Sequence, residues 1–267
     1  MGENHLVLLK RNWRLINIGL LLNEREYAEK ALRECKMGRK PSKTLGILIK
    51  YYTSQGYSKE KVRRLIEDFM LRCNPDINLV KWQSSLDRWI PYFSAKKLIE
   101  IDYIEITEAE LETCRMQKTR VTQQVTFTLI CLAKYFDIID GVNGGWVNCP
   151  EIEIFKSACY QINSMRRSLL FNDLKNLGLI SFASRVNNIN IKVECIDRDS
   201  PVALKITDLR NLGLQFRKAI GESYMECTSC GLTIKQKHHT QKYCPTCARE
   251  VNIKKTIDNF KSRNAQI

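Results

Sequence analysis

The sequence predicts a mainly α-helical protein with a minor β part (α+β minor). Apolar side chains recur at helical spacing from residue 23 to residue 97, whereas strand-like patterns are short and begin after residue 98. The chain of 267 residues has only 12 Gly and 6 Pro, too few for a sandwich of many tight turns. We expect five segments, namely a basic helical domain in 1–97, a hinge in 98–120, a second domain in 121–220, a cysteine-rich segment in 225–250 and a basic tail in 251–267.

The N-terminal segment is predicted to hold four short helices joined by short connections. Polar residues able to cap a helix precede the first three, and an Asn-Pro-Asp turn precedes the fourth. The expected helices run from Glu24 to near Gly38, from Ser42 to Gly56, from Lys59 to Leu71 and from Leu79 to Tyr92, with Asn23, Ser42 and Ser58 as caps. We expect the fourth to bury Val80, Trp82, Leu86, Trp89 and Ile90.

The hinge contains a predicted strand followed by an acidic helix. Residues 99–106 alternate apolar and polar side chains, and Thr107 can cap a helix that begins at Glu108. Four nearby carboxylates could suggest a metal or general-base site. We interpret them instead as a solvated helix start that the helix dipole stabilises; they are Glu105, Glu108, Glu110 and Glu112.

Residues 121–200 show an ordered series of predicted elements. A long helix over 122–138 is followed by a glycine-bearing loop, a short strand at 146–148, a short helix from Pro150 to about Ala158 and a helix from Asn163 or Ser164 to Asn176. Strands over 179–184 and 189–196 then flank Asn187-Asn188, a pair that tolerates the left-handed conformation of a tight turn. This order, with the Leu-Lys-Asn-Leu-Gly-Leu-Ile text of residues 174–180, resembles the winged helix-turn-helix family.

The resemblance implies a DNA-binding surface made of one helix and one wing. The helix would lie in the major groove and the wing would touch the phosphate backbone. The implied helix contacts are Arg166, Arg167, Ser168, Asn172 and Lys175, and the implied wing contacts are Arg185, Asn187 and Lys192. Arginines near the helix N-terminus favour this interpretation over the alternative, a winged helix that binds another protein.

Four cysteines form two closely spaced pairs near the C-terminus. Cys227 and Cys230 form one Cys-x-x-Cys pair, Cys244 and Cys247 form the other, and 13 residues separate the pairs. Two such pairs supply four thiolates in tetrahedral geometry, the closed coordination of structural zinc. Residues 225–250 resemble the zinc-ribbon family, and the resemblance implies strands at 232–234 and 242–243.

Other uses of the four cysteines fit the sequence less well. An iron–sulfur cluster would use the same ligands but gains no support from neighbouring residues. Two disulfides would need an oxidising compartment, and a redox-active pair would need the strand–helix setting of thioredoxin-like sites. His238 and His239 are interpreted as loop residues, since four sulfur ligands are already present. We therefore expect zinc as the cofactor.

Charge points to a polyanionic partner. The chain has 43 Lys and Arg against 29 Asp and Glu, a net charge of +14. The excess is greatest at the two ends, with net +9 in residues 1–64 and net +6 in residues 227–267. We expect nucleic acid as the partner, DNA in preference to RNA, with electrostatic contacts from Arg39, Lys40 and Lys43 in an N-terminal loop and from Lys254 and Lys255 in the tail. The alternative is that these charges only keep the protein soluble.

The sequence predicts neither catalysis nor membrane insertion. It lacks a P-loop and a nucleophile elbow, and it has only three histidines. It has no apolar run of about eighteen residues, and its N-terminus does not resemble a secretory signal. Seven cysteines are scattered singly, as in proteins of a reducing compartment. We expect a cytoplasmic protein that is not an enzyme and has no membrane partner.

Two functional hypotheses follow from these observations. The layout is similar to that of uncharacterised replication and regulatory proteins of Gram-positive phages and mobile elements, which implies DNA binding in replication initiation or transcription control. The alternative is an interaction protein that binds and inhibits a host protein or ribonucleoprotein complex. Steep salt dependence of binding would favour the first hypothesis.

Overall fold

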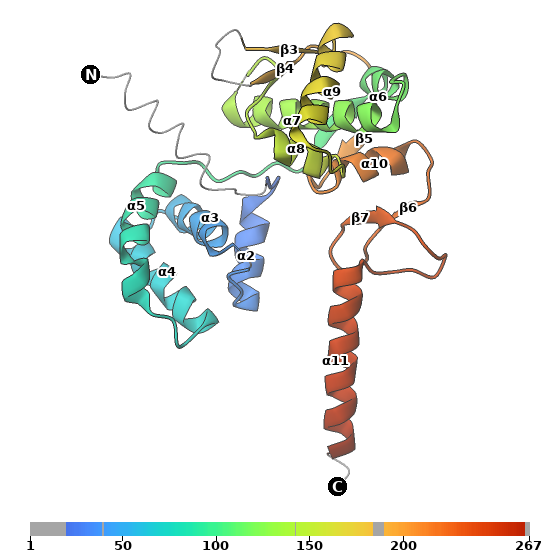
Figure 1. The fold of residues 1–267 in the computed structure, drawn as a ribbon. Helices are drawn as coiled ribbons and strands as arrows, with labels where there is room; N and C mark the ends of the chain where they lie inside the picture. Colours follow the sequence, from blue (N-terminus) through green and yellow to red (C-terminus); the bar gives the residue numbers. More distant parts are fainter. Residues whose placement is uncertain (1–19, 39, 142, 184–189, 265–267) are drawn as a thin grey trace, which may run out of the picture. The chain divides into compact units, whose positions relative to one another are not determined.

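The computed structural model describes residues 20–38, 40–141, 143–183 and 190–264 (Figure 1). It divides the chain between Asp102 and Tyr103 into two compact units, a boundary inside the stretch predicted as a hinge. The described residues are mainly α-helical, with three small antiparallel sheets. The predicted fold class is therefore confirmed. Among these residues, no helix is both long enough and apolar enough to cross a membrane.

The first unit consists of short helices with capped starts. They are α2 (Glu24–Glu34), α3 (Pro41–Ser54), α4 (Lys59–Cys73), the 3-10 helix η1 (Leu79–Trp82) and α5 (Gln83–Ser94). As predicted, the Asn23 side chain accepts a hydrogen bond from the Glu26 N–H at 2.9 Å, and the Ser58 side chain caps α4.

Two predicted boundaries in this unit are wrong. Helix α2 ends at Glu34 instead of near Gly38, because Cys35 adopts the left-handed conformation with φ of 49°. Helix α3 begins at Pro41, so Ser42 lies inside the helix and is not its cap. The proline ring fixes a helical φ, and its missing N–H is not needed in the first turn.

The predicted single helix over 79–92 is two elements. The Asn78 side chain accepts a hydrogen bond from the Val80 N–H at 3.0 Å and starts the 3-10 turn before α5 begins. The tighter turn rotates side chains away from their α-helical positions. Val80, predicted to be buried, is 80% exposed, whereas Leu86 and Ile90 are buried as predicted. The predicted core tryptophans, Trp82 and Trp89, are partly buried at the edge of the core.

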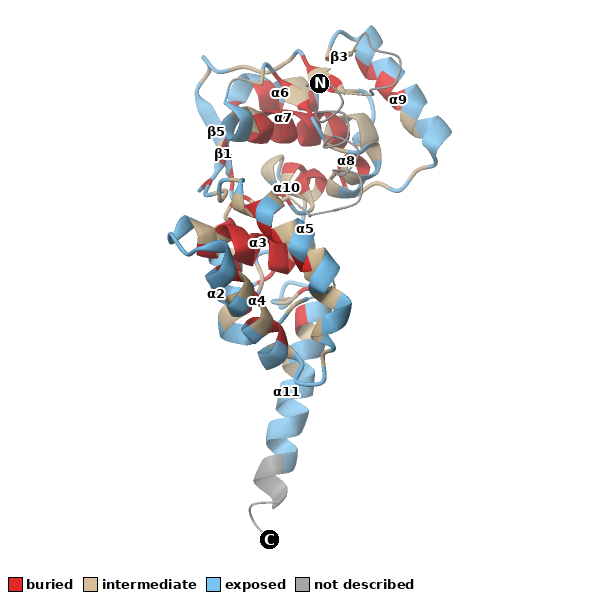
Figure 2. Ribbon diagram, turned by 90° about the vertical axis from the view of Figure 1, so that its left-hand side faces the viewer, coloured by how far each residue is buried: buried red, intermediate tan, exposed pale blue. Residues whose placement is uncertain are grey.

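Helix α3 supplies the centre of the first unit's core, and Figure 2 shows most of it in the colour of buried residues. A Cβ at Gly46 would lie 2.7 Å from the Phe93 ring, so the glycine permits close packing of α5 on α3. Lys50 of α3 forms a buried ion pair with Glu24, whose carboxylate also accepts a hydrogen bond from the Ile99 N–H at 2.9 Å. The pair fastens the start of α2 to α3.

The second unit begins with a strand that pairs far along the chain. Strand β1 (Ile104–Thr107) is antiparallel to β5 (Val202–Ile206), with Ile104 opposite Ile206. The predicted strand over 99–106 is thus shorter than expected at its start, and its partner strand was not predicted. Helices α6 (Glu108–Arg115) and α7 (Arg120–Asp140) follow, and Thr107 caps α6 as predicted.

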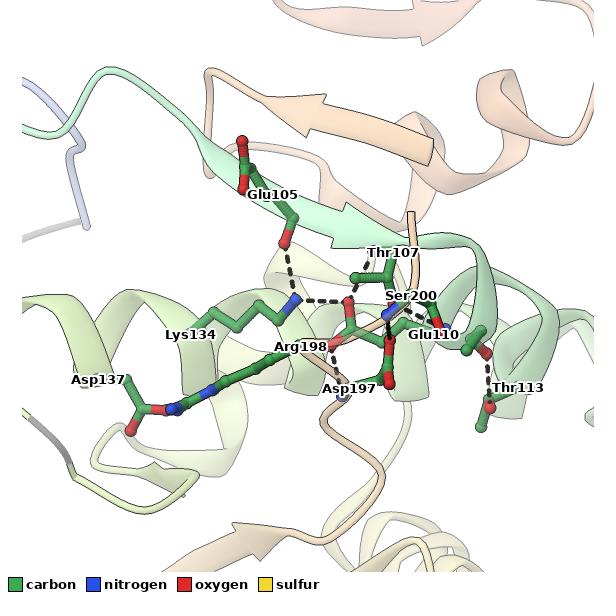
Figure 3. A network of polar contacts seen from close by, with 10 residues as sticks. Glu105, Thr107, Glu110, Thr113, Lys134, Asp137, Asp197, Arg198 and Ser200 are labelled. Atoms are coloured by element: carbon green, nitrogen blue, oxygen red, sulfur yellow. Dashed lines mark hydrogen bonds and ion pairs between the residues drawn. The ribbon is translucent and has the colours of Figure 1, made fainter. Parts of the chain in front are cut away.

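Glu110 corrects the interpretation of the acidic helix start as solvated. Its side chain is fully buried and accepts hydrogen bonds from the Thr107 N–H at 2.9 Å and the Asp197 N–H at 3.1 Å (Figure 3). Lys134 of α7 pairs with the same carboxylate at 2.6 Å and also donates to the Glu105 carbonyl oxygen. Glu110 therefore joins α6 to α7 and to the segment before β5, while Glu108 and Glu112 remain exposed.

The next elements follow the predicted order. Helix α7 is followed by β2 (Trp146–Val147), α8 (Glu151–Ser157), α9 (Ser164–Asn176), β3 (Ile180–Phe182) and β4 (Ile191–Val193). The strands form one antiparallel sheet in the order β2-β4-β3. The two hairpin strands are shorter than predicted, and the predicted turn at Asn187-Asn188 lies outside the described residues.

The last elements include two helices that were not predicted with these bounds. Helix α10 (Leu212–Ala219) packs on α7, with the Phe127 and Phe216 ring centroids 5.3 Å apart. Strands β6 (Tyr224–Glu226) and β7 (Thr233–Lys235) form a hairpin, and α11 (Pro245–Asn264) follows (Figure 1). The strand predicted at 242–243 is absent from this described segment. The predicted basic tail of residues 251–267 continues α11 as far as Asn264.

Candidate metal centre and nucleic-acid interface

The four paired cysteines converge on one point. The Sγ atoms of Cys227, Cys230, Cys244 and Cys247 all lie within 4.8 Å of one another. A metal held tetrahedrally at about 2.3 Å by four sulfurs would place those sulfurs about 3.8 Å apart. The Sγ atoms of Cys230 and Cys244 are 3.8 Å apart. The four thiols can therefore hold one metal ion, with no other side chain required.

The two cysteine pairs are positioned by different local structures. Cys227 and Cys230 lie in the connection between β6 and β7, where the Gly231 N–H donates to the Cys227 carbonyl oxygen at 2.8 Å. Gly231 has φ of 70°, a conformation that suits glycine. Cys244 directly precedes α11 and Cys247 lies in its first turn, where the Cys247 N–H donates to the Cys244 Sγ at 3.4 Å. Pro245, between these two cysteines, is the first residue of α11.

Backbone donors favour a thiolate at Cys227. Burial opposes ionisation of this thiol, but N–H groups of Cys244, Ser229 and Cys230 outweigh burial and lower its pKa to about 6. The Cys244 N–H lies 3.2 Å from the Cys227 Sγ. Metal ions bind cysteine as the thiolate, so these donors favour the metal-binding form of Cys227.

The cysteine segment is fastened to the loop before α10. The Arg210 guanidinium donates to the Cys230 carbonyl oxygen at 2.6 Å, and the Asn211 side chain donates to the Thr233 carbonyl oxygen at 2.9 Å. Asp208 pairs with Arg210 and orients it. Sequence reasoning missed these supporting residues, because nothing local relates them to the cysteine pairs. His238 and His239 are exposed and do not belong to the ligand cluster, in agreement with their interpretation as loop residues.

Helix α9 presents most of its candidate contact residues to solvent. Asn163 caps it by accepting from the Arg166 N–H at 2.9 Å. The side chains exposed along the helix include Arg166, Ser168, Asn172 and Lys175. The Lys175 ammonium lies 5.5 Å from the centroid of the Phe182 ring, so this side chain leans toward β3 of the adjoining sheet. These residues are available to a partner.

Arg167 differs from its neighbour Arg166. Its guanidinium donates to the Ile162 carbonyl oxygen at 3.1 Å and lies 3.5 Å from the Glu151 carboxylate, with 19% of the side chain exposed. The residue joins the start of α9 to α8. Arg167, which the winged-helix resemblance implies as a DNA contact, is therefore mostly covered and paired within the protein, whereas Arg166 is exposed.

The remaining candidate contacts belong to the wing, the N-terminal loop and the tail. Lys192 of β4 pairs with Glu194 at 2.7 Å. Lys40 is exposed beside the start of α3, whereas Lys43 packs its ammonium 5.1 Å from the Tyr27 ring centroid. Lys254 and Lys255 are exposed on α11. Arg39, Arg185 and Asn187 lie outside the described residues.

Helix α11 carries an exposed apolar stripe that sequence reasoning missed. Ile253, Ile257 and Phe260 are 53%, 47% and 64% exposed. Their spacing of four and three residues places them on one face of the helix. That spacing is visible in the sequence as a helical periodicity, although basic side chains dominate the composition of the segment.

Comparisons of the chain with protein-family models, with curated proteins and with solved structures found no match. The geometry of the chain itself therefore carries its functional interpretation.

Proposed function

We propose that this chain is a DNA-binding protein that acts in replication initiation or transcription control. The observation that carries the proposal is the position of α9. This helix precedes a hairpin in a three-stranded sheet of order β2-β4-β3, and its outer face is exposed and bears Arg166, Asn172 and Lys175. Such an order of elements is the one expected for a winged helix-turn-helix, in which this helix enters the major groove. The net charge of +14 supports a polyanionic partner.

In this proposal the four cysteines bind structural zinc. Four sulfur ligands complete the tetrahedral coordination that zinc prefers, and they leave no open position for a substrate. The ion would hold the β6–β7 hairpin against the start of α11. By fixing the start of α11, zinc would also fix the direction in which the helix presents Lys254 and Lys255.

The two adjacent arginines of α9 provide a direct test of DNA binding. We expect Arg166→Ala to weaken binding to duplex DNA and to reduce the salt slope by about one, without changing stability, because its side chain is exposed and lies outside the protein core. We expect Arg167→Ala to lower stability by about 1 kcal/mol through loss of its hydrogen bond and ion pair. Both variants are measured by duplex titration at several salt concentrations and by thermal unfolding.

The salt series also separates the proposed partner from its competitors. Duplex binding by the native chain should weaken steeply as salt rises. Duplex RNA of matched sequence serves as the comparison and should bind less tightly than DNA. Absence of salt-sensitive duplex binding, or equal binding by native protein and Arg166→Ala, would remove α9 as the DNA contact.

A second candidate function is favoured by the stripe on α11. An apolar face with basic flanks such as Arg249 and Lys254 suits a groove of a partner protein with apolar walls and an acidic rim. The chain would then bind a host protein or ribonucleoprotein complex and inhibit it. Like charges beside the stripe oppose pairing with a second copy of α11.

This second function has its own test. Purified native chain and the Ile257→Asp variant are compared for capture of host proteins in high salt after nuclease treatment. A captured complex that the variant loses would support this function. Because Ile257 is exposed, the variant should keep the stability of the native protein, and Asn252→Asp supplies a control with the same charge change on the same helix.

A further inference from the structure

The outer face of α9 has a centre that is neutral and partly apolar. The buried side of the helix carries Leu170, Phe171 and Leu174. An α-helix turns about 100° per residue, so Met165, Leu169 and Asn172 fall within about 60° of one another on the opposite side. Met165 is 73% exposed and Leu169 is 54% exposed. A surface strip of two large apolar side chains and one amide thus lies along the centre of this helix.

A positive charge lies on each side of this strip, and on the side of Arg166 the exposed carboxylate of Asp173, about 80° from Met165, accompanies it. By the same rotation, Arg166 lies about 100° from Met165 in one direction and Lys175 about 80° in the other. Both side chains are exposed. Seated in a groove, the helix would direct these charges toward the two phosphate backbones and the strip toward the bases between them.

The chemistry of the strip matches one kind of base pair. In the major groove, thymine alone presents a methyl group, which apolar side chains contact, and adenine presents the donor and acceptor that an asparagine amide pairs with. Guanine is read mainly by arginine or lysine, and neither occurs in the strip. Ser168 beside it directs its hydroxyl to the Ser164 carbonyl oxygen at 3.2 Å.

Resting on the DNA-binding function proposed above, we infer that α9 reads A·T pairs. Met165 and Leu169 contact thymine methyl groups, and Asn172 pairs with the edge of an adenine. Arg166 and Lys175 contact phosphates and position the helix. The binding site is accordingly rich in A·T pairs where α9 enters the major groove.

The test removes thymine methyl groups without changing base pairing. A pool of randomised duplexes is enriched on the native protein, and the recovered sequence is synthesised with thymine and again with uracil. Replacement should weaken binding about fourfold for each methyl contacted, as expected for loss of one buried carbon group. The Met165→Ala, Leu169→Ala double variant should bind the two duplexes equally. Asn172→Ala should lower the preference for A·T over G·C at one position by about tenfold or more.

The control variant changes an exposed apolar side chain that lies outside the strip. Leu177→Ala removes an exposed apolar side chain just beyond α9 and about 120° from Met165, so it should retain the discrimination between thymine and uracil. Equal binding of thymine and uracil duplexes by the native protein would overturn the inference while leaving DNA binding in place. Enrichment of G·C-rich sequences would also overturn it. Failure to bind any duplex would overturn the proposed function itself.

Discussion

The first unit and the cysteine segment have different kinds of core. One core is apolar, and the other is centred on cysteines. The core of the first unit is built from apolar side chains of α2, α3, α4 and α5, among them Leu48, Ile66 and Phe93. The corresponding cluster around β6, β7 and the start of α11 has cysteines as its buried members, with Leu232, Ile234 and Tyr243 only partly buried around them.

Because of this difference, we expect the two regions to be stabilised by different interactions. Each fully buried large apolar side chain contributes about 1.5–3 kcal/mol, so we expect the stability of the first unit to depend on its apolar core. The cysteine segment lacks such a core, and a structural metal can supply an apparent binding free energy of about 10–16 kcal/mol. A metal chelator should therefore act on one region and leave the other intact.

Metal removal is the prediction with the largest expected effect. We expect Cys244→Ser to abolish stoichiometric metal binding and to unfold the segment from 225 to 250, because three thiolates no longer close the site. Elemental analysis should find about one zinc per native chain. Hydrogen exchange should show reduced protection in this segment and unchanged protection in α3 and α5.

The control for this prediction is Cys35→Ser, which changes a partly exposed cysteine of the first unit. That variant should keep its metal. A native protein prepared without chelator and found free of metal would contradict the whole comparison, as would a decrease in α3 protection when Cys244 is changed.

The features that could be predicted from the sequence are the local ones. Capping by Asn23, Ser58 and Thr107 depends on residues within one helical turn, and convergence of the four thiols follows from the spacing of each pair. Pairing of β1 with β5 could not be read in this way, because the two strands lie far apart in the sequence.

The sequence does not predict side-chain environments that residues distant in the chain create. Glu110 lies in a helix start that is acidic and was interpreted as solvated, but Lys134 and the Asp197 N–H enclose it. Arg167 has the same type of side chain as Arg166, yet the preceding helix α8 supplies a partner for it alone. Amino-acid composition cannot distinguish a buried charged side chain from an exposed one of the same type.

The next prediction weakens the apolar core of the first unit alone. Phe93→Ala should lower the free energy of unfolding of this unit by about 3–5 kcal/mol, because it empties the space above Gly46. Denaturant unfolding followed by tryptophan fluorescence measures the change. Val80→Ala, at an exposed position, should change stability by less than about 0.5 kcal/mol. Loss of bound metal in Phe93→Ala would show that the two regions are not independent.

A third prediction concerns the buried ion pair of the second unit. Lys134→Met should cost about 3 kcal/mol, since it leaves the Glu110 carboxylate buried without its cation. Adding Glu110→Gln should recover part of this decrease, because the uncompensated charge is then gone, while the single amide oxygen can accept from only one of the Thr107 and Asp197 N–H groups. Thermal unfolding of the native chain and of the single and double variants measures the coupling. Additive effects of the two changes would contradict the role of the pair as the link between α6 and α7.

The prediction with the smallest expected effect concerns the contribution of the basic N-terminal loop to duplex binding. Changing Lys40 and Lys43 to Gln should reduce affinity for every duplex alike and flatten the salt slope by about 0.9 for each phosphate that the protein no longer neutralises. The Lys43 ammonium lies 5.1 Å from the centroid of the Tyr27 ring, so a phosphate contact would have to compete with or share this position. The control changes Lys59 and Lys61 to Gln, two exposed lysines at the start of α4, and removes the same charge from the same unit. Equal slopes for the native chain and the Lys40, Lys43 variant would assign these lysines to solubility. A smaller slope in both pairs of variants would instead trace the effect to net charge, because binding would then depend on no particular part of the unit.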